Sequence, residues 1–337
     1  MTISNLIPGV CSRGYLPVLL TILACLSPIA RCVDAADPKR SFIAADSSKQ
    51  RIAIIGEDGK TVWEAKIGPL HDLHVLPNGN VLYQKTWTEI AEVNPKSGEP
   101  IWSYDAKAIP ANQSVPMEIH AFQRLADGKT MVAESGPGRI IELDQKLKIT
   151  STMALKVSRP DPHRDTRLVR KLASGNYLVC HEGDGLVREY DPSGKIVWEY
   201  SVPLFGHEPK PGHGVEAFGN QAFSALRLPN GNTLIGAGNG HAVLEVNPKG
   251  DVVWSIHQND LEGIQLAWVT SLQVLPSGNI LINNCHAGPK NPQLIEVNRD
   301  KKVVWSFHDF ERFGDSLTNS QVLTVDGKPI VSSDVLR

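Results

Sequence analysis

Histidine is the residue type most able to do chemistry in this sequence, and the chain contains eleven of them. Several lie at matching points of a repeat, so they are predicted to share one end of the folded domain. The starts of the innermost strands supply His71, His120 and Arg167, and loops at the same end supply Glu134, His181, His241 and His286. Two tryptophans outside the repeat pattern, Trp87 and Trp268, could stack on a ligand ring.

Histidine beside arginine permits more than one chemistry. Arg167 offers a fixed planar charge for an anion, and His71 or His120 could serve as nucleophile or acid/base in sulfuryl or phosphoryl transfer. Neutral imidazoles also bind metals. His71 with His120 and His286 is a better metal set than His71 with His74, because residues three apart on a strand face opposite sides. The alternative is that these side chains only hydrogen-bond to backbone and water.

Two cysteines, Cys180 and Cys285, each precede one of these histidines. They lie two repeats apart, and a disulfide needs Cα atoms within about 7 Å, so reduced, buried thiols are favoured over a bridge. A Cys/His metal site across the channel is the alternative. His71, His120 and Arg167 are catalytic candidates, but these patterns assign no complete catalytic set, metal or cofactor.

The elements that must position these residues follow a repeat of polar turns. Each turn has a glycine after a polar residue, and the turns recur about 50 residues apart, a period typical of propeller blades. These glycines are Gly79, Gly128, Gly175, Gly231, Gly278 and Gly327. A tryptophan closes five of the units and is expected to pack between adjacent sheets: Trp63, Trp102, Trp198, Trp254 and Trp305.

Six innermost strands predict an all-β, six-bladed β-propeller of four-stranded antiparallel blades. The segment Phe42–Glu64 supplies strands two to four of one blade, and Ser320–Val335 supplies strands one and two. The two ends should therefore close the ring, leaving no sheet edge exposed. This arrangement contains one second strand too many.

Short motifs carry a family resemblance. Gly98–Trp102, Gly194–Trp198 and Gly250–Trp254 resemble the repeat of quinoprotein-like propellers, which have pyrroloquinoline quinone-type repeats. His71–Leu82 (HDLHVLPNGNVL) and Ser271–Ile282 (SLQVLPSGNILI) are similar to arylsulfotransferase-type propellers.

The two resemblances imply different chemistry. Arylsulfotransferases imply a histidine at the rim as covalent nucleophile. Quinone-dependent dehydrogenases typically have eight blades, bound calcium and often an adjacent cysteine pair, so pyrroloquinoline quinone is an unlikely cofactor for this chain. The fold itself supports many unrelated functions.

The composition and the N-terminal segment limit the possible partners and the cellular location of this protein. With 34 basic and 36 acidic residues the net charge is −2, so the chain lacks the basic surface that nucleic-acid binders need.

Residues 1–35 contain the apolar run Tyr15–Ala30, followed by small or apolar residues at Val33 and Ala35, a pattern typical of a cleaved secretory signal peptide. A lipoprotein anchored through Cys25 is the minor alternative. Residues 36–337 are expected to form one secreted or periplasmic propeller without a membrane span.

The leading hypothesis is a binding or scaffold protein that uses a His/Arg-lined, loop-rich face. Its partner would be a small molecule or protein at the channel mouth, and not nucleic acid. Because no complete catalytic set can be assigned, an arylsulfotransferase-like enzyme is the alternative, and a quinone-dependent dehydrogenase is less favoured.

Overall fold

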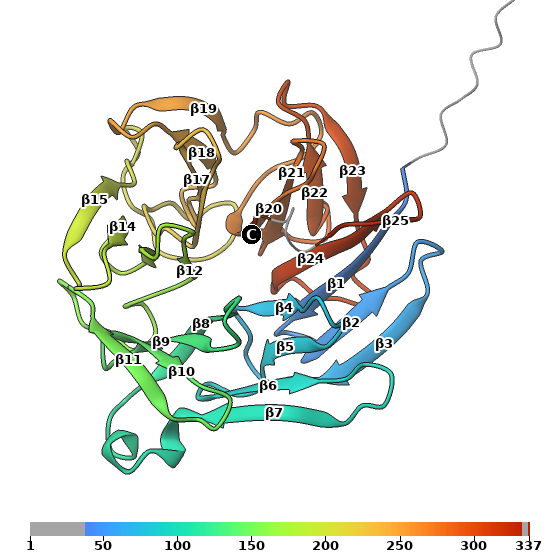
Figure 1. The fold of residues 1–337 in the computed structure, drawn as a ribbon. Coiled ribbons are helices and arrows are strands. Elements are labelled where there is room, and N and C mark those ends of the chain that lie inside the picture. Colours follow the sequence, from blue (N-terminus) through green and yellow to red (C-terminus); the bar gives the residue numbers. More distant parts are fainter. Residues whose placement is uncertain (1–37, 332–335) are drawn as a thin grey trace, which may run out of the picture. The chain divides into compact units, whose positions relative to one another are not determined.

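A computed structural model describes residues 38–331 and 336–337, so the expected signal peptide lies outside the described residues. The chain forms six antiparallel sheets around a central axis (Figure 1). The sequence prediction of a six-bladed propeller is confirmed. No helix in the described ranges is long and apolar enough to cross a membrane.

Five blades are each built from four consecutive strands, and the first strand of each lies nearest the axis (Figure 1). Blade 1 contains β4 (Leu73–Val75), β5 (Val81–Gln84), β6 (Glu89–Val93) and β7 (Pro100–Asp105). Two short 3-10 turns, η1 (Ala106–Ala108) and η2 (Pro110–Asn112), lead to blade 2, which contains β8 (Glu118–Arg124), β9 (Thr130–Ser135), β10 (Arg139–Leu143) and β11 (Ile149–Ala154).

The next three blades repeat this order. Blade 3 contains β12 (Val169–Lys171), β13 (Tyr177–His181), β14 (Leu186–Tyr190) and β15 (Ile196–Ser201). Blade 4 contains β16 (Ser224–Arg227), β17 (Thr233–Gly236), β18 (Val243–Val246) and β19 (Val252–Ile256). Blade 5 contains β20 (Trp268–Val274), β21 (Ile280–Cys285), β22 (Leu294–Val297) and β23 (Val303–Phe307).

The sixth blade joins the two ends of the domain, as predicted. Strand β24 (Leu317–Val325) pairs with β1 (Arg40–Asp46), which is followed by β2 (Arg51–Ile55) and β3 (Thr61–Lys66). The surplus second strand of the sequence prediction is β25 (Lys328–Pro329), which pairs with the other side of β24 at only two positions. Strand β1 is therefore the true second strand of blade 6.

Neighbouring blades are joined by a repeated ion pair, here termed the interblade pair. In each of blades 1 to 5, a glutamate on the third strand contacts a cation of the next blade. The pairs are Glu92–Arg124, Glu142–Lys171, Glu189–Arg227, Glu245–Arg299 and Glu296–Arg40. In four blades the asparagine after the turn glycine also donates to this glutamate, as Asn80 does to Glu92 at 2.6 Å.

The boundary between blade 6 and blade 1 is different. The glutamates of blades 1, 3, 4 and 5 lie opposite the repeat tryptophan, but in blade 6 Ile54 lies opposite Trp63. This boundary combines apolar packing, with Ile52 and Leu70 among its buried residues, with hydrogen bonds from β24, in which Thr318 donates to the Leu70 carbonyl at 2.6 Å and Asn319 to the His71 carbonyl at 2.9 Å.

The repeat tryptophans lie at the predicted blade boundaries but are only half-buried. Trp254 packs at the edge of the core cluster shared by blades 4 and 5, and its indole N–H donates to the Arg299 carbonyl at 2.9 Å. The Arg299 guanidinium lies 4.7 Å from the ring centroid. The tryptophans therefore lie at the blade boundaries as expected, and in blades 1, 3 and 4 an arginine lies over the ring.

Replacing Trp254 with alanine should lower the free energy of unfolding by about 2–3 kcal/mol. This is below the range of about 3–5 kcal/mol for a fully buried aromatic, because part of the ring already contacts solvent or arginine. Urea unfolding of the variant measures the loss, and Trp254→Phe, which keeps an aromatic ring, should recover part of it. A loss under about 0.5 kcal/mol, typical of a neutral surface substitution, would contradict the packing role.

A charged network crosses the channel on the side of the glycine turns. The buried Asp72 carboxylate accepts from Arg170 at 2.8 and 3.0 Å. Arg170 in turn donates to the Arg337 carbonyl at 2.7 Å, and Arg337 donates to the Asn319 side chain at 2.7 Å. The Leu336 carbonyl accepts from the Val274 amide at 2.8 Å. The chain's last residues thus contact blades 1, 3, 5 and 6 at the centre of the ring (Figure 1).

Candidate functional site

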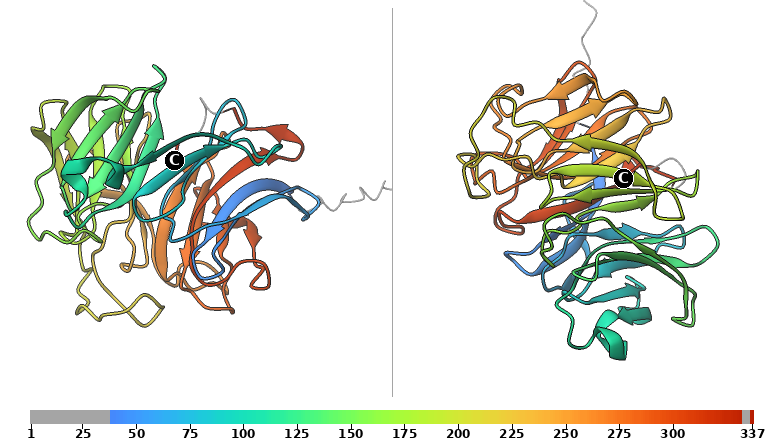
Figure 2. Two further views of the ribbon diagram at one scale, coloured as in Figure 1. Left: turned by 90° about the horizontal axis from the view of Figure 1, so that it is seen from below. Right: turned by 90° about the vertical axis from the view of Figure 1, so that its left-hand side faces the viewer.

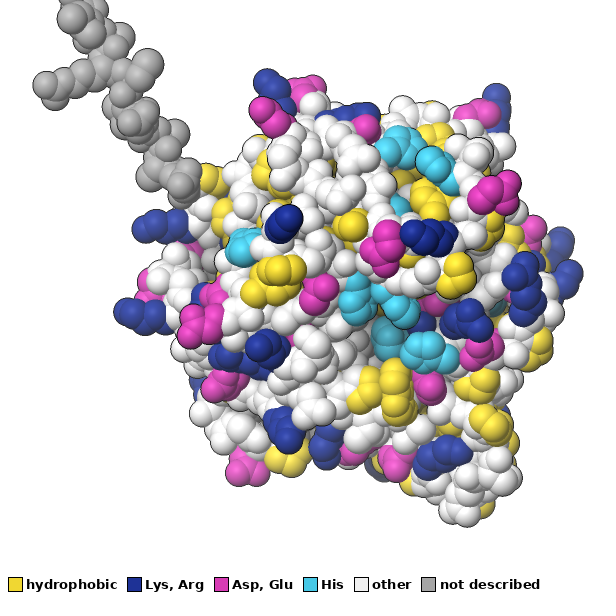
Figure 3. Space-filling model, turned by 180° about the vertical axis from the view of Figure 1, so that it is seen from behind, with side chains coloured by type: hydrophobic (Ala, Val, Ile, Leu, Met, Phe, Trp, Pro, Cys, Tyr) yellow, Lys and Arg dark blue, Asp and Glu magenta, His cyan; other side chains and the backbone are white. Residues whose placement is uncertain are grey.

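The opposite face carries the long connections, as the strand order requires. The segment between β15 and β16 projects furthest from this side (yellow in Figure 2). Histidine side chains gather near the middle of the face (Figure 3). They form two groups, which are described separately.

The first histidine group contains His71, His120 and His163, with Trp87 at its edge. The His71 ring lies 4.6 Å from His120 and 5.9 Å from His163, measured between centroids, and it stacks on Trp87 at 5.6 Å. His120 is the unpaired residue of a bulge in β8, since Ile119 pairs with Glu134 and Ala121 with Ala133. Bulges turn a side chain away from strand alternation. His120, the residue in this bulge, has its ring beside those of His71 and His163.

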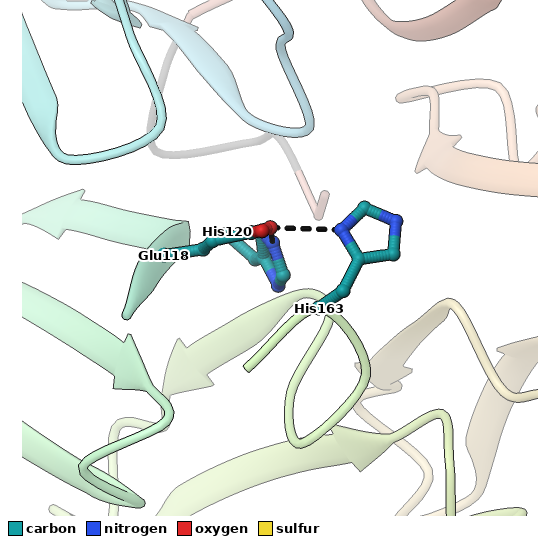
Figure 4. Close-up of side chains that lie close together, drawn as sticks. All are labelled: Glu118, His120 and His163. Carbon is teal, nitrogen blue, oxygen red and sulfur yellow. Dashed lines mark hydrogen bonds and ion pairs between the residues drawn. The ribbon is translucent and has the colours of Figure 1, made fainter. Parts of the chain in front are cut away.

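Two members of this site were missed in the sequence, Glu118 and His163. The Glu118 Oε2 atom lies 2.7 Å from His120 Nε2 and 2.8 Å from His163 Nδ1 (Figure 4). The Glu118-x-His120 spacing is a signal the sequence did offer, because residues two apart on a regular strand point to the same side, but the bulge at His120 interrupts that alternation and is not visible in the sequence. His163 comes from the loop between β11 and β12. The periodicity of the sequence does not determine the path of this loop.

The first group places two buried imidazoles, His71 and His120, close to the Glu118 carboxylate. Burial, with Arg167 nearby, lowers the pKa of His71 well below its usual range and that of His120 to about 4. Burial acts to raise the pKa of Glu118, but contacts with His120 and His163 outweigh it and bring the pKa to about 2. The Nδ1 atom of His71 is buried without a hydrogen-bond partner in the described part of the chain.

Arg167 lies beside this group but is already engaged. Its guanidinium contacts the Glu182 carboxylate and the His163 carbonyl, and its Nη1 lies 3.1 and 3.4 Å from the two ring nitrogens of His120. Arg167 is 3% exposed, so it acts mainly as a fixed internal charge. The predicted role of Arg167 as a free anion-binding cation is therefore not supported by its contacts.

The second histidine group contains His213 and His286, with Trp268. The His213 ring lies 5.1 Å from His286 and 4.6 Å from Trp268. Burial and His213 lower the pKa of His286. His286 was expected beside His71 and His120, but it belongs to this separate group on blade 5.

Three other predicted residues do not join either group. His181 uses both ring nitrogens inside the protein, at 2.8 Å from the Asp165 carbonyl and 2.9 Å from the Tyr190 hydroxyl. His241 faces the carbonyls of Ala267 and Ala217 at 2.6 and 2.5 Å. Glu134 accepts from Tyr104 and Arg139. Internal partners therefore engage these three side chains, and none of the three joins either histidine group.

Cys180 and Cys285, the cysteines within the described residues, are free and buried, in agreement with the favoured interpretation. Burial raises the pKa of both thiols far above its usual range, so neither is a reactive thiolate. Cys180 belongs to an apolar cluster, and Cys285 packs with Trp268. Neither belongs to the one cluster of His, Cys, Asp and Glu that is close enough to hold a metal ion among the described residues.

A pocket of about 650 Å³ connects the two histidine groups, since His163 and both His213 and Trp268 line it. Its wall contains two acidic residues that have basic or amide partners: Asp161 pairs with Arg164 at 2.8 Å, and Glu182 contacts Arg167 and Gln221. The wall also contains Arg159 and Lys210, both exposed. Neither forms an ion pair within the described residues.

A closed ring of six antiparallel blades, with a turn glycine in each and a tryptophan in five of them, defines a β-propeller with pyrroloquinoline quinone-type repeats. The chain belongs to the family described as outer membrane protein assembly factor BamB, whose model matches residues 48–307. The quinoprotein-like resemblance is thereby confirmed, whereas similarity to arylsulfotransferases remains a prediction.

Solved structures share the fold. A protein of unknown function from Bacteroides caccae is 25% identical, with a TM-score of 0.70 over 84% of this chain and 98% of its own. A catalytically inactive virginiamycin B lyase from Staphylococcus aureus, solved with quinupristin, is 11% identical, with a TM-score of 0.52 over 83% of this chain and 88% of its own. At this identity, the similarity to the lyase shows only a shared fold. No curated protein sequence matches this chain.

Proposed function

We propose that this protein is an exported binding propeller that holds a small anionic molecule in the pocket between the two histidine groups. The observation that carries the proposal is the charge of the pocket wall. Its acidic residues, Asp161 and Glu182, are paired, whereas Arg159 and Lys210 have no ion-pair partner among the described residues. An anion would supply the missing partner for these two cations.

The pocket wall also favours a ligand with an aromatic part. Trp268 and Phe218 lie in the wall beside its polar groups. A mainly concave site with apolar surface and a few charged groups is typical of small-molecule binding. An aryl sulfate combines both features and is therefore a suitable probe.

The sulfuryl-transfer alternative has weaker support. It needs a cation free to hold the transferred group beside a nucleophilic histidine. Arg167 is the cation beside His120 that this chemistry would use, and Glu182 already neutralises it. Binding without turnover is therefore the function that these contacts favour.

We expect 4-nitrophenyl sulfate to bind the metal-free protein, as measured by isothermal titration calorimetry. Arg159→Ala and Lys210→Ala should each weaken binding by about fivefold, corresponding to about 1 kcal/mol for an exposed charge contact. Raising the salt concentration should weaken binding in the same direction because the interaction is screened.

The matched control is Lys195→Ala, which removes a lysine in the turn between β14 and β15, away from the pocket wall. It should leave the affinity unchanged. Equal affinity in all four proteins would contradict the anion site. Release of 4-nitrophenol in the presence of phenol would favour the sulfuryl-transfer alternative.

A further inference from the structure

We propose that Glu118, His120 and His163 bind one divalent transition-metal ion of the zinc class. The three side chains place one carboxylate oxygen and two imidazole nitrogens within 4.8 Å of one another (Figure 4). Two histidines and one glutamate are a suitable donor set for zinc, and three protein ligands leave a further position open. This inference does not depend on the anion proposed above.

The hydrogen bonding of His120 favours a cation at this point. Its Nδ1 atom lies 2.7 Å from the Thr166 carbonyl oxygen, which can only accept, so Nδ1 carries the proton. The nearly equal distances from Arg167 Nη1 to both ring nitrogens place that group beside the ring rather than along one lone pair. The other ring nitrogen, His120 Nε2, faces Glu118 Oε2 at 2.7 Å. In the metal-free protein a shared proton joins these two atoms, and a divalent ion would take the place of that proton.

The surroundings of the three residues resemble the support of a metal site. A backbone carbonyl that accepts from the remote nitrogen of a ligating histidine fixes its tautomer and orientation, which is the role the Thr166 carbonyl has for His120. The loop that carries His163 is held by Asp161, whose side chain accepts from the His163 amide at 2.9 Å. The Asp161 amide in turn donates to Asp165 at 2.6 Å.

All three donor separations must adjust to admit the ion. Bonds of about 2.0–2.1 Å in a tetrahedral arrangement separate the donor atoms by about 3.3 Å. The two contacts of Glu118, at 2.7 and 2.8 Å, must each widen by roughly half an ångström, and the two imidazole nitrogens, which lie within 4.8 Å of each other, must reach the same separation. The His163 side chain is 48% exposed and belongs to a loop, so it can provide this movement.

A second, independent observation points to a missing group beside the three ligands. His71 is 8% exposed, its ring contacts the ring of His120, and its Nδ1 has no hydrogen-bond partner in the described residues. A buried polar atom of this kind is costly unless water or a ligand satisfies it. Because His163 also lines the pocket, the proposed metal site adjoins it.

The test is calorimetric titration of the full chain, stripped with a chelator, with Zn²⁺ alone. We expect one ion per chain. Glu118→Gln and His163→Ala should each weaken binding by more than the roughly 10–100-fold typical of losing an outer-shell partner. Zn²⁺ should also raise the unfolding temperature of the parent protein and fail to do so in the two variants.

The matched control is His308→Ala, because His308 follows β23 of blade 5 and lies outside both histidine groups. It should bind Zn²⁺ as the parent does. Absence of stoichiometric binding by the parent, or equal binding by the parent and the Glu118 and His163 variants, would overturn the proposal. Because Zn²⁺ is titrated without an organic ligand, this failure would leave the proposed anion binding unaffected.

Discussion

Removing β24 is expected to abolish cooperative folding of the propeller. Strand β24 supplies the innermost strand of blade 6 and pairs with β1 from Arg40 to Asp46. Its Leu317 and Val322 are buried in the core cluster between blades 5 and 6. A chain that ends at Ser316 would leave β1 as an open edge and lose this core. We expect the free energy lost in this way to exceed the total stability of a typical domain, which is about 5–15 kcal/mol.

Thermal unfolding followed by circular dichroism tests this expectation. The matched control ends at Val331, which keeps β24 and β25 while removing Leu336 and Arg337. The control should still unfold cooperatively, at a lower temperature than the parent because the contacts of Arg337 are lost. A chain ending at Ser316 with the parent's unfolding temperature would show that closure by the two ends is not needed.

The largest effect of a single substitution is expected for Asp72→Asn. This change removes the carboxylate charge facing Arg170 in the channel, and it leaves a buried cation with no full counter-charge. Breaking one side of a buried ion pair typically costs about 3–5 kcal/mol. Chemical denaturation at neutral pH measures the loss, and Asp58→Asn, in an exposed pair with Lys60, is the control that should leave stability unchanged.

The same variant has a pH signature. Burial alone would raise the pKa of Asp72, but Arg170 and His74 outweigh it and hold the pKa well below its usual range. A carboxyl with a lowered pKa contributes stability above its ordinary pKa of about 3.9 and loses that contribution as the pH falls further. The difference in stability between parent and variant should therefore shrink below about pH 4. A difference that stays constant into acid would contradict the ion-pair explanation.

The sequence predicted the architecture well because its signals are local and repeated. Turn glycines such as Gly79 adopt positive φ, and the segments between them alternate as strands, so blade number and closure could be inferred. The extra strand was ambiguous because two residues, Lys328 and Pro329, resemble the start of a second strand. Their pairing with β24 depends on competition with β1, which no local pattern reveals.

The candidate site was predictable only in part. The equivalent positions of His71, His120 and Arg167 in the repeat predicted that they lie close together, and their side chains are in contact. Position in the repeat does not, however, determine where each side chain points. His181 occupies a comparable position, yet a carbonyl and a tyrosine hydroxyl hold it inside the blade. His163 joined the site through a loop path that depends on Asp161, which requires tertiary structure.

The interblade pairs also define where the ring is most able to open. Five boundaries have a glutamate and a cation linking two blades, whereas the boundary between β3 and blade 1 has Ile54 at the corresponding position. Local unfolding begins where few interactions must break. The outer strand β3 should therefore separate first and exchange its amide hydrogens ahead of the other outer strands, while β24 and β1 stay paired. The ring would then loosen only at the outer edge of this boundary, because Thr318 and Asn319 of β24 still hold the inner part of blade 6 to blade 1 through hydrogen bonds to Leu70 and His71.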